Sequence, residues 1–295
     1  MILFRVMQAT CPLCSDSARL DFQKFDDSYY RCSCGFVFIW PRPSEEYLQD
    51  LYRKHGEEYW TDERMVRFTL SPSKSRREIA FLRQFASKGK LLDIGCSTGS
   101  FVRAACDAGF QAEGVDISAP AVQCGNKIGL PLYCADVLKE HIPKKYDIIT
   151  MWATAEHLPN PLRHLSRAKE LLNQGGLLFV SVPNYKSLSQ KILGKWDRYV
   201  GRDHLNYFTP PTLRNTLEHL GLSIRGTTTY GFNPFVLYRD WRNRGTASLS
   251  VEDMQSDQAA TLAIKESPIR MMQTAAERIL DVCSLGDVVA VCAQI

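Results

Sequence analysis

The chain has 295 residues, of which 45% are hydrophobic and 23% are charged, and its formal net charge is +4. This length holds one full α/β domain and a smaller unit, and the modest charge, without a run of Lys or Arg, gives no indication of a nucleic-acid partner. No stretch of about 18 apolar residues could span a membrane, and residues 1–6 are too few for the apolar core of a signal peptide. We therefore expect a cytoplasmic protein with no membrane partner.

Two close pairs of cysteines mark the first predicted unit. Cys11-Pro12-Leu13-Cys14 is followed, after 17 residues, by Cys32-Ser33-Cys34-Gly35. Residues 28–31 and 36–40 have the composition of hairpin strands. Four thiolates at two such turns would close a tetrahedral zinc site and stabilise a segment too small to bury a core. The spacing predicts a structural zinc ribbon over residues 1–42, with ligands Cys11, Cys14, Cys32 and Cys34. The second pair is tighter than the usual two-residue spacer, so reduced, unligated cysteines are the alternative.

An aromatic-rich stretch connects the predicted ribbon to the rest of the chain. Pro41-Arg42-Pro43 ends the ribbon, and the large apolar side chains that follow are Tyr47, Leu48, Leu51, Tyr52, Tyr59 and Trp60. We expect residues 43–75 to form a helical segment that is either a cover over a ligand site or a packed linker.

A strand, a tight loop and a helix are predicted from residue 91 onward. The run Leu91-Leu92-Asp93-Ile94 leads into Gly95-Cys96-Ser97-Thr98-Gly99, and an amphipathic segment follows. Small residues let a ligand approach the backbone closely, and the helix N-terminus adds unpaired N–H groups. Asp116, at the end of the next predicted strand, lies 21 positions after Gly95, close to the spacing of about 20 expected for a carboxylate that binds ribose hydroxyls. The pattern predicts a nucleotide pocket.

The loop lacks the three-glycine pattern G-x-G-x-x-G of dinucleotide sites. Asp93 stands two positions before Gly95, where its charge would repel phosphates but could help to position a cationic ligand. Here the chain resembles the class I S-adenosylmethionine-dependent methyltransferases, whose D/E-x-G-x-G-x-G motif matches Asp93, Gly95, Ser97 and Gly99. Ser97 replaces the middle glycine of that motif. A chance match in a purely structural turn is the alternative.

The resemblance covers roughly residues 75–230. It implies that Asp136 hydrogen-bonds the adenine amino group, with Val137 beside the ring, although an Asp after a strand is often only a turn or cap residue. The apolar run Tyr146–Trp152 and the Gly-Gly turn before residues 177–183 match later strands of the family. The donor-binding residues that the resemblance implies are Asp93, Gly95, Cys96, Gly99, Asp116, Ile117, Asp136, Val137 and Trp152.

Two of the six histidines stand in contexts suited to catalysis. An oxygen, nitrogen or acidic carbon acceptor must lose a proton, and a histidine with a pKa near neutrality suits that role. His157 lies in a segment that resembles the E-x-x-E-H segment of quinone-biosynthesis O-methyltransferases; Ala153 occupies its first acidic position, so we expect no catalytic metal. His204 lies in a stretch that resembles the D/E-H-x-x-x-F-T segment of related methyltransferases. A structural hydrogen bond is the alternative for each histidine.

The resemblance implies a Rossmann-like, doubly wound α/β fold. Its seven-stranded sheet would have the order 3-2-1-4-5-7-6, with the last strand antiparallel and a small zinc ribbon at the N-terminal end. We expect the methyltransferase domain to occupy residues 76–295, with an insertion at about 232–285. In this insertion Met271, Ala275, Ile279 and Val282 recur at helical spacing, which indicates a packed face.

The sequence thus predicts an enzyme that uses S-adenosylmethionine and a structural zinc ion. A zinc ribbon ahead of a class I methyltransferase domain resembles a recurring bacterial arrangement, in which the enzymes modify sugars, nucleotide-linked sugars or related small metabolites. We therefore expect a small-molecule acceptor. Two other interpretations stay open. One is an NAD(P)-dependent oxidoreductase, against which the missing third glycine and Asp93 argue, and the other is a non-catalytic ribbon protein that binds a partner. The accepting atom and the oligomeric state stay open as well.

Overall fold

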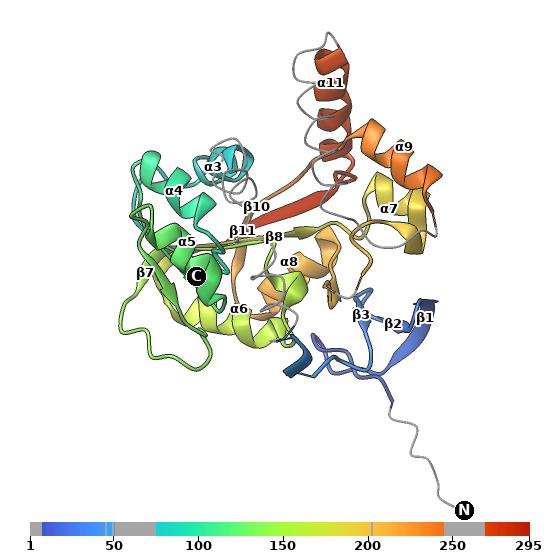
Figure 1. Cartoon of the computed structure of the whole chain (residues 1–295), viewed down its shortest axis with the longest axis horizontal. Helices are drawn as coiled ribbons and strands as arrows, with labels where there is room; N and C mark the ends of the chain where they lie inside the picture. Colours follow the sequence, from blue (N-terminus) through green and yellow to red (C-terminus); the bar gives the residue numbers. More distant parts are fainter. Residues whose placement is uncertain (1–7, 45, 49, 51–74, 202, 245–268) are drawn as a thin grey trace, which may run out of the picture. The chain divides into compact units, whose positions relative to one another are not determined.

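The structure, a computed structural model, describes residues 8–44, 46–48, 50, 75–201, 203–244 and 269–295 (Figure 1). Their contacts divide the chain into two compact units. Unit 1 takes its residues from 1–41, 182–214 and 227–290, and unit 2 takes its residues from 42–181, 215–226 and 291–295. The predicted segments 1–42, 43–75 and 76–295 stay a prediction, because most of residues 43–75 and much of 232–285 lie outside the described residues.

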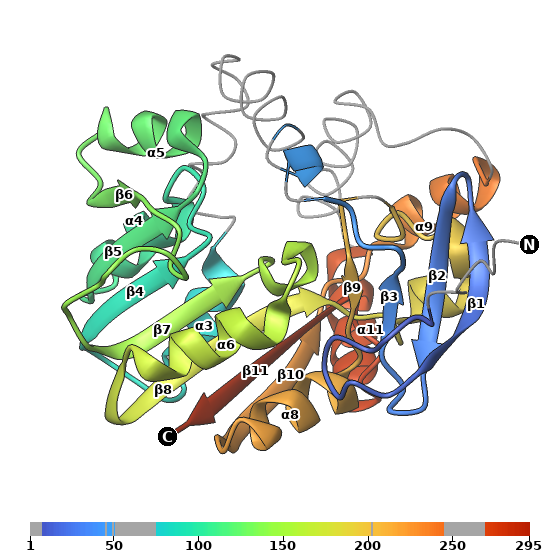
Figure 2. The same ribbon diagram turned by 90° about the horizontal axis from the view of Figure 1, so that it is seen from below.

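The large sheet has seven strands in the order β10-β11-β8-β7-β4-β5-β6. Numbered along the chain within this sheet, the order is 6-7-5-4-1-2-3, which confirms the predicted order, and the last strand runs antiparallel (Figure 2). The strands are β4 (Lys90–Ile94), β5 (Gln111–Asp116), β6 (Leu132–Cys134), β7 (Tyr146–Trp152), β8 (Leu172–Pro183), β10 (Ser223–Tyr230) and β11 (Val288–Gln294).

The central strands β4 and β7 are buried on both faces. Leu91, Leu92, Ile148 and Ile149 are almost fully buried, as the continuous apolar runs predict for strands in the middle of a parallel sheet. The pairs β4–β5, β4–β7, β5–β6 and β7–β8 are all parallel. Because parallel strands end at the same edge of a sheet, the loops that follow β4, β5, β6 and β7 lie along one edge of unit 2, where such folds bind ligands.

One helix of unit 2 begins where a capping side chain and a proline place it. Asn160 caps the helix that starts at Pro161, because its side chain accepts a hydrogen bond from the Arg163 N–H at 3.1 Å. Phe81 and Phe85 pack edge-on against Phe179 of the sheet. The helical elements are α3 (Arg76–Leu82), α4 (Ser100–Asp107), α5 (Ala119–Asn126), the short 3-10 helix η1 (Ala155–His157) and α6 (Pro161–Glu170). Helix α8 (Pro210–His219) runs from unit 1 into unit 2.

Unit 1 contains a second, four-stranded sheet in the order β1-β2-β3-β9. The expected hairpin strands are present as β2 and β3. The fourth strand, β9, comes from a distant part of the sequence, and no sequence signal predicted it. The strands are β1 (Ala18–Lys24), β2 (Asp27–Cys32), β3 (Val37–Ile39) and β9 (Asn206–Tyr207), and the helices are α7 (Leu188–Leu193), the 3-10 helix η2 (Gly194–Trp196), α9 (Pro234–Arg242) and α11 (Ile269–Val282).

The predicted helix near the C-terminal end is present as α11, but its packed face differs from the expected one. Ile279 and Val282 are exposed, whereas Leu280 between them is buried. Asp281 accepts hydrogen bonds from the Thr229 N–H at 2.6 Å and from the Thr228 hydroxyl at 3.1 Å, which attaches α11 to β10. Within the described ranges, none of the helices combines the length and the apolar composition that a bilayer crossing requires.

Candidate functional site

The loop between β4 and α4 has an alternating left-handed backbone. Gly95, Ser97 and Gly99 have φ angles of 78°, 50° and 82°. The N–H groups of Gly95 and Cys96 both donate to the Val115 carbonyl of β5, at 2.8 and 3.1 Å. The loop is therefore held against the end of β5, and its small residues leave the backbone accessible to a ligand.

The backbone conformation favours glycine at two positions of this loop, and neighbouring side chains restrict the space there. A Cβ at Gly95 would lie 2.5 Å from Oγ1 of Thr154, and one at Gly99 would lie 2.8 Å from Cδ1 of Leu132. Ser97, which stands where the family motif has its middle glycine, adopts the left-handed region at a cost of about 1–2 kcal/mol.

Asp116 is fixed at the end of β5 by two backbone donors. Its Oδ2 accepts the Ser97 N–H and its Oδ1 accepts the Ser118 N–H, both at 2.8 Å. Burial raises the pKa of this carboxyl, while the two N–H bonds oppose that rise. Each oxygen keeps further acceptor capacity, which suits a pair of ligand hydroxyls. The next residue, Ile117, is a large apolar side chain that is 56% exposed, and it would suit the flat face of an adenine ring.

Asp93 is a buried carboxyl beneath the loop. It is 3% exposed, and its Oδ1 accepts the hydroxyl of Thr150 at 2.7 Å. Burial raises the pKa of Asp93 to about 7, against the lowering effect of the Thr150 hydrogen bond. A cation bound nearby would favour the carboxylate form, so the placement agrees with an electrostatic role toward a cationic ligand.

Asp136 makes the contacts of a turn residue, which is the alternative to adenine binding given for it in the sequence analysis. Its Oδ1 accepts the Leu138 N–H at 2.9 Å, and its Oδ2 lies 3.4 Å from Nζ of Lys139. Val137 is buried, and its carbonyl accepts from Nε of Arg167 at 3.0 Å. These contacts hold the β6 end in place, and contact of Asp136 and Val137 with adenine stays a prediction.

Trp152 ends β7 with a buried donor. Its ring packs against Phe101 at 5.2 Å and Phe179 at 6.1 Å between centroids. Its indole Nε1 is buried and has no hydrogen-bond partner among the described residues. A buried donor without an acceptor costs about 1–3 kcal/mol, and contact of Trp152 with a ligand stays a prediction.

His157 lies in η1, next to the carboxyl of Glu156. The sequence pattern names Glu156 only as part of a motif and gives it no role. Glu156 is 1% exposed, and burial raises its pKa to about 8. Nε2 of His157 lies 3.9 Å from Oε1 of Glu156, and the backbone N–H of His157 donates to the Thr154 carbonyl at 3.1 Å. These contacts fix where His157 lies in η1, and its role as a base stays a prediction.

His204 belongs to unit 1. Its Nδ1 lies 2.9 Å from the Tyr199 carbonyl, and its ring stacks on the Tyr199 ring at 6.0 Å with an interplanar angle of 11°. A carbonyl accepts only, so in the neutral imidazole Nδ1 carries the proton and Nε2 carries the lone pair. That tautomer can accept a proton. His157 and His204 lie in different units, and each role rests on its own local contacts.

The four predicted zinc ligands lie together in unit 1. Sγ of Cys11 is 3.8 Å from Sγ of Cys34, and Sγ of Cys14 is 3.4 Å from Sγ of Cys32; all four sulfurs are within 4.8 Å of one another. A Zn–S distance of about 2.3 Å places the sulfurs of a tetrahedral site about 3.8 Å apart. The four thiol groups therefore fit a zinc ion.

Residues 63–226 match the model of a family described as "Methyltransferase domain". The chain belongs to this family. Among curated proteins, a ubiquinone biosynthesis O-methyltransferase from Vibrio cholerae is 28% identical over 161 residues, which are 50% of this chain and 66% of that relative. Another from Methylococcus capsulatus is 22% identical, over 62% of this chain and 84% of that relative. The chain thus matches 66% of the length of the first of these relatives.

Solved structures agree on the fold. An S-adenosylmethionine-dependent methyltransferase from Thermotoga maritima is similar with a TM-score of 0.51 and 16% identity, over 83% of this chain and 98% of that one. Magnesium protoporphyrin IX methyltransferase from Synechocystis PCC 6803, solved with S-adenosylhomocysteine, has a TM-score of 0.51 and 18% identity, over 65% of this chain and 95% of that one. The predicted membership of the methyltransferase family is confirmed, and the cysteine cluster is compatible with a zinc ribbon. The family match speaks against the nicotinamide-dependent alternative.

Proposed function

We propose that the protein transfers a methyl group from S-adenosylmethionine to a small-molecule acceptor. The observation that carries the proposal is Asp116, whose carboxylate is fixed by the Ser97 and Ser118 N–H groups at the sheet edge, with Ile117 exposed beside it. A carboxylate in this place suits the two ribose hydroxyls of an adenosyl group. The absence of the dinucleotide glycine pattern favours adenosyl over dinucleotide binding.

The other donor contacts are proposed from their local geometry. The backbone of the loop at Gly95, Cys96 and Gly99 would border the methionine part of the donor, with Asp93 below it as an electrostatic partner for positive charge. Ile117 and Val137 would flank the adenine ring and Asp136 would accept from its amino group. Trp152, at the end of β7, would border the donor with its ring.

We further propose a hydroxyl oxygen as the accepting atom. The curated relatives are named O-methyltransferases, which supports oxygen and does not bear on the expected sugar, nucleotide-linked sugar or related metabolite. When bound, S-adenosylmethionine supplies a methyl group on a sulfonium, so a C–O bond forms as the C–S bond breaks and the hydroxyl proton must leave. His204, with Nε2 as the lone-pair nitrogen, is the proposed base, and His157 beside Glu156 is the second candidate.

Label transfer to candidate acceptors tests this proposal. Hydroxylated sugars, nucleotide-linked sugars and phenols would be incubated with methyl-labelled S-adenosylmethionine, and labelled product would be identified by mass spectrometry. We expect an O-methylated product and a loss of about 100-fold or more in kcat for His204→Gln. His219→Gln, on the exposed side of α8, is the matched control. Label on nitrogen or carbon, or full activity of His204→Gln and His157→Gln together, would contradict the assignment.

The cysteine cluster is proposed as a structural zinc site. Its four thiolates would complete the coordination of the ion and leave no open position for a substrate. Metal analysis of the purified protein should give one zinc per chain, and Cys14→Ser should lower that content. Cys283→Ser, an exposed cysteine in unit 1, should leave it unchanged.

A further inference from the structure

The ribbon sheet of unit 1 shares a strand with the segment that carries His204. β3 pairs antiparallel with β9, with Val37 opposite Tyr207 and Phe38 opposite Asn206 (Figure 2). The Ile39 N–H also donates to the Leu205 carbonyl at 3.1 Å. The residue that accepts this bond follows His204 directly, so the edge of the ribbon sheet sets the path of the backbone next to the imidazole.

A buried aromatic cluster joins the same two parts. Tyr29 of β2 packs on Tyr207 with 5.6 Å between ring centroids, and Phe36 packs on Phe208 at 4.9 Å. All four rings are buried. The Cys32 N–H donates to the Phe36 carbonyl at 2.9 Å. The turn that carries the second cysteine pair therefore helps to position Phe36, which packs against Phe208.

The tip of the β1–β2 hairpin holds the other end of the segment. Lys24 donates from Nζ to the Val200 carbonyl, and the ring of Phe25 meets Trp196 edge-on at 6.3 Å. The Nζ of Lys195 lies 3.4 Å from the Gln23 carbonyl. The ribbon therefore contacts the segment 195–208 both before and after His204.

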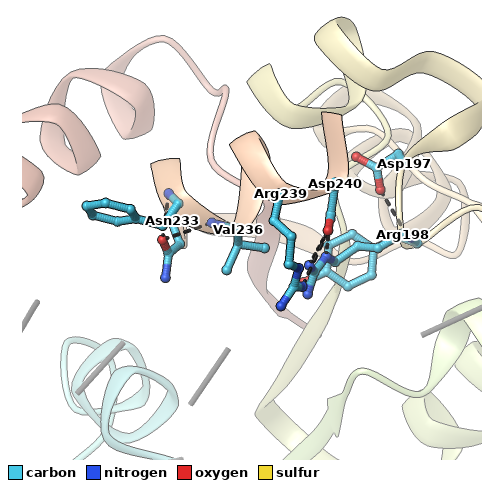
Figure 3. Close-up of polar contacts among 8 residues, drawn as sticks. Asp197, Arg198, Asn233, Val236, Arg239 and Asp240 are labelled. Carbon is cyan, nitrogen blue, oxygen red and sulfur yellow. Dashed lines mark hydrogen bonds and ion pairs between the residues drawn. The ribbon is translucent and has the colours of Figure 1, made fainter. Parts of the chain in front are cut away.

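Two further contacts of this segment do not involve the ribbon. Arg198 makes a bidentate ion pair with Asp240 of α9, in which Nε donates to Oδ2 at 2.7 Å and Nη2 donates to Oδ1 at 2.8 Å (Figure 3). The Tyr207 hydroxyl donates to the Gly201 carbonyl at 3.0 Å and accepts the Gly201 N–H at 3.3 Å. The second contact joins Gly201 to Tyr207, one on each side of His204 in the sequence.

We infer that the ribbon positions His204, so that metal at Cys11, Cys14, Cys32 and Cys34 controls the order of the segment 195–208. The inference rests on the proposed function for the role of His204 but not for the contacts themselves. Loss of the metal releases the second cysteine pair, Phe36 and the β3 edge together, whereas the donor-binding loop of unit 2 has no residue in the ribbon. Metal removal should therefore disorder the acceptor side and spare donor binding.

Hydrogen exchange on the full chain tests this inference. Zinc-loaded and chelator-treated protein would be compared by mass spectrometry, with S-adenosylhomocysteine binding measured on both by calorimetry. We expect exchange in residues 203–208 to be at least tenfold faster without zinc, with residues 90–94 of β4 and the affinity for S-adenosylhomocysteine unchanged. Cys34→Ser should reproduce the faster exchange, and the matched variant Cys283→Ser should not.

A variant that leaves the ligands intact separates positioning from folding. Tyr207→Phe removes the hydroxyl that closes the loop, so the Gly201 amide should exchange at least tenfold faster while the zinc content stays the same. Unchanged exchange in residues 203–208 after zinc removal would overturn the inference even if Tyr207→Phe speeds the exchange of Gly201, as would unfolding of β4 on zinc removal. Failure of the zinc-loaded wild type to bind S-adenosylhomocysteine would instead refute the proposed function and leave the exchange result valid.

Discussion

The buried carboxyl of Asp93 makes the stability of unit 2 depend on pH in a predictable direction. Its pKa is about 7 in the folded chain, compared with an ordinary value of 3.8, because burial disfavours the charged form. Because the folded chain favours protonated Asp93, this group contributes its full stabilisation below pH 3.8. That stabilisation is lost as the pH rises through 7. Between pH 5 and pH 8 the loss amounts to about 2–3 kcal/mol.

Asp93→Asn removes this titration and keeps a side-chain oxygen for the Thr150 hydroxyl. Chemical denaturation of the wild type and the variant, at several pH values from 5 to 8, would give the free energy of unfolding of each. The difference between the two curves isolates Asp93 from the other carboxyls whose pKa is raised by burial, which are Asp116, Glu156, Asp197 and Asp287. We expect the wild type to lose stability relative to the variant as the pH rises. Parallel curves would refute the reasoning.

Saturating S-adenosylmethionine should reduce that pH dependence. A positive charge near Asp93 favours its carboxylate, so the bound state should have a lower pKa for this group than the free state. The same denaturation series with ligand would measure the change. A pH dependence that is identical with and without ligand would place Asp93 outside the electrostatic reach of the donor.

Other contacts in unit 2 give three further expectations. Gly95→Ala places a Cβ 2.5 Å from Thr154 Oγ1 at a φ of 78° and should lower the free energy of unfolding by at least about 2 kcal/mol. The loss should be smaller for Gly109→Ala, whose φ is 93° but whose Cβ meets nothing within 4 Å. Ser97→Gly relieves the left-handed strain at a cost in chain entropy and should stabilise by up to about 1 kcal/mol in urea unfolding; a loss of stability would contradict the strain. Thr150→Val removes the donor to Asp93 and should destabilise by about 1–3 kcal/mol at pH 8 but less at pH 5.

Local patterns in the sequence are sufficient to predict much of unit 2. The apolar run Tyr146–Trp152 coincides with β7 residue for residue, because a strand buried on both faces needs a continuous apolar sequence. The small residues of the loop and the spacing to Asp116 placed the carboxylate beside Ser97, since βαβ geometry fixes how far apart such residues can lie.

Contacts between distant residues could not be predicted in this way. Asp93 and Thr150 are 57 positions apart, and Arg198 and Asp240 are 42 apart, so no local pattern carries either pair. β9 has two residues, too few for a detectable alternation. In α11 the period of apolar residues predicted the helix, but the exposed Ile279 and Val282 show that a period alone does not say which face is packed.

The central claim is that the edge of unit 2 binds an adenosyl donor through Asp116. Calorimetric titration with S-adenosylhomocysteine and with NADH, on the wild type, Asp116→Ala and the exposed control Asp107→Ala, tests it most directly. The account predicts binding of S-adenosylhomocysteine alone, weakened about 100-fold in Asp116→Ala by loss of two charge-assisted hydrogen bonds and unchanged in Asp107→Ala. Preference for NADH, or equal affinity of Asp116→Ala and the wild type, would contradict it.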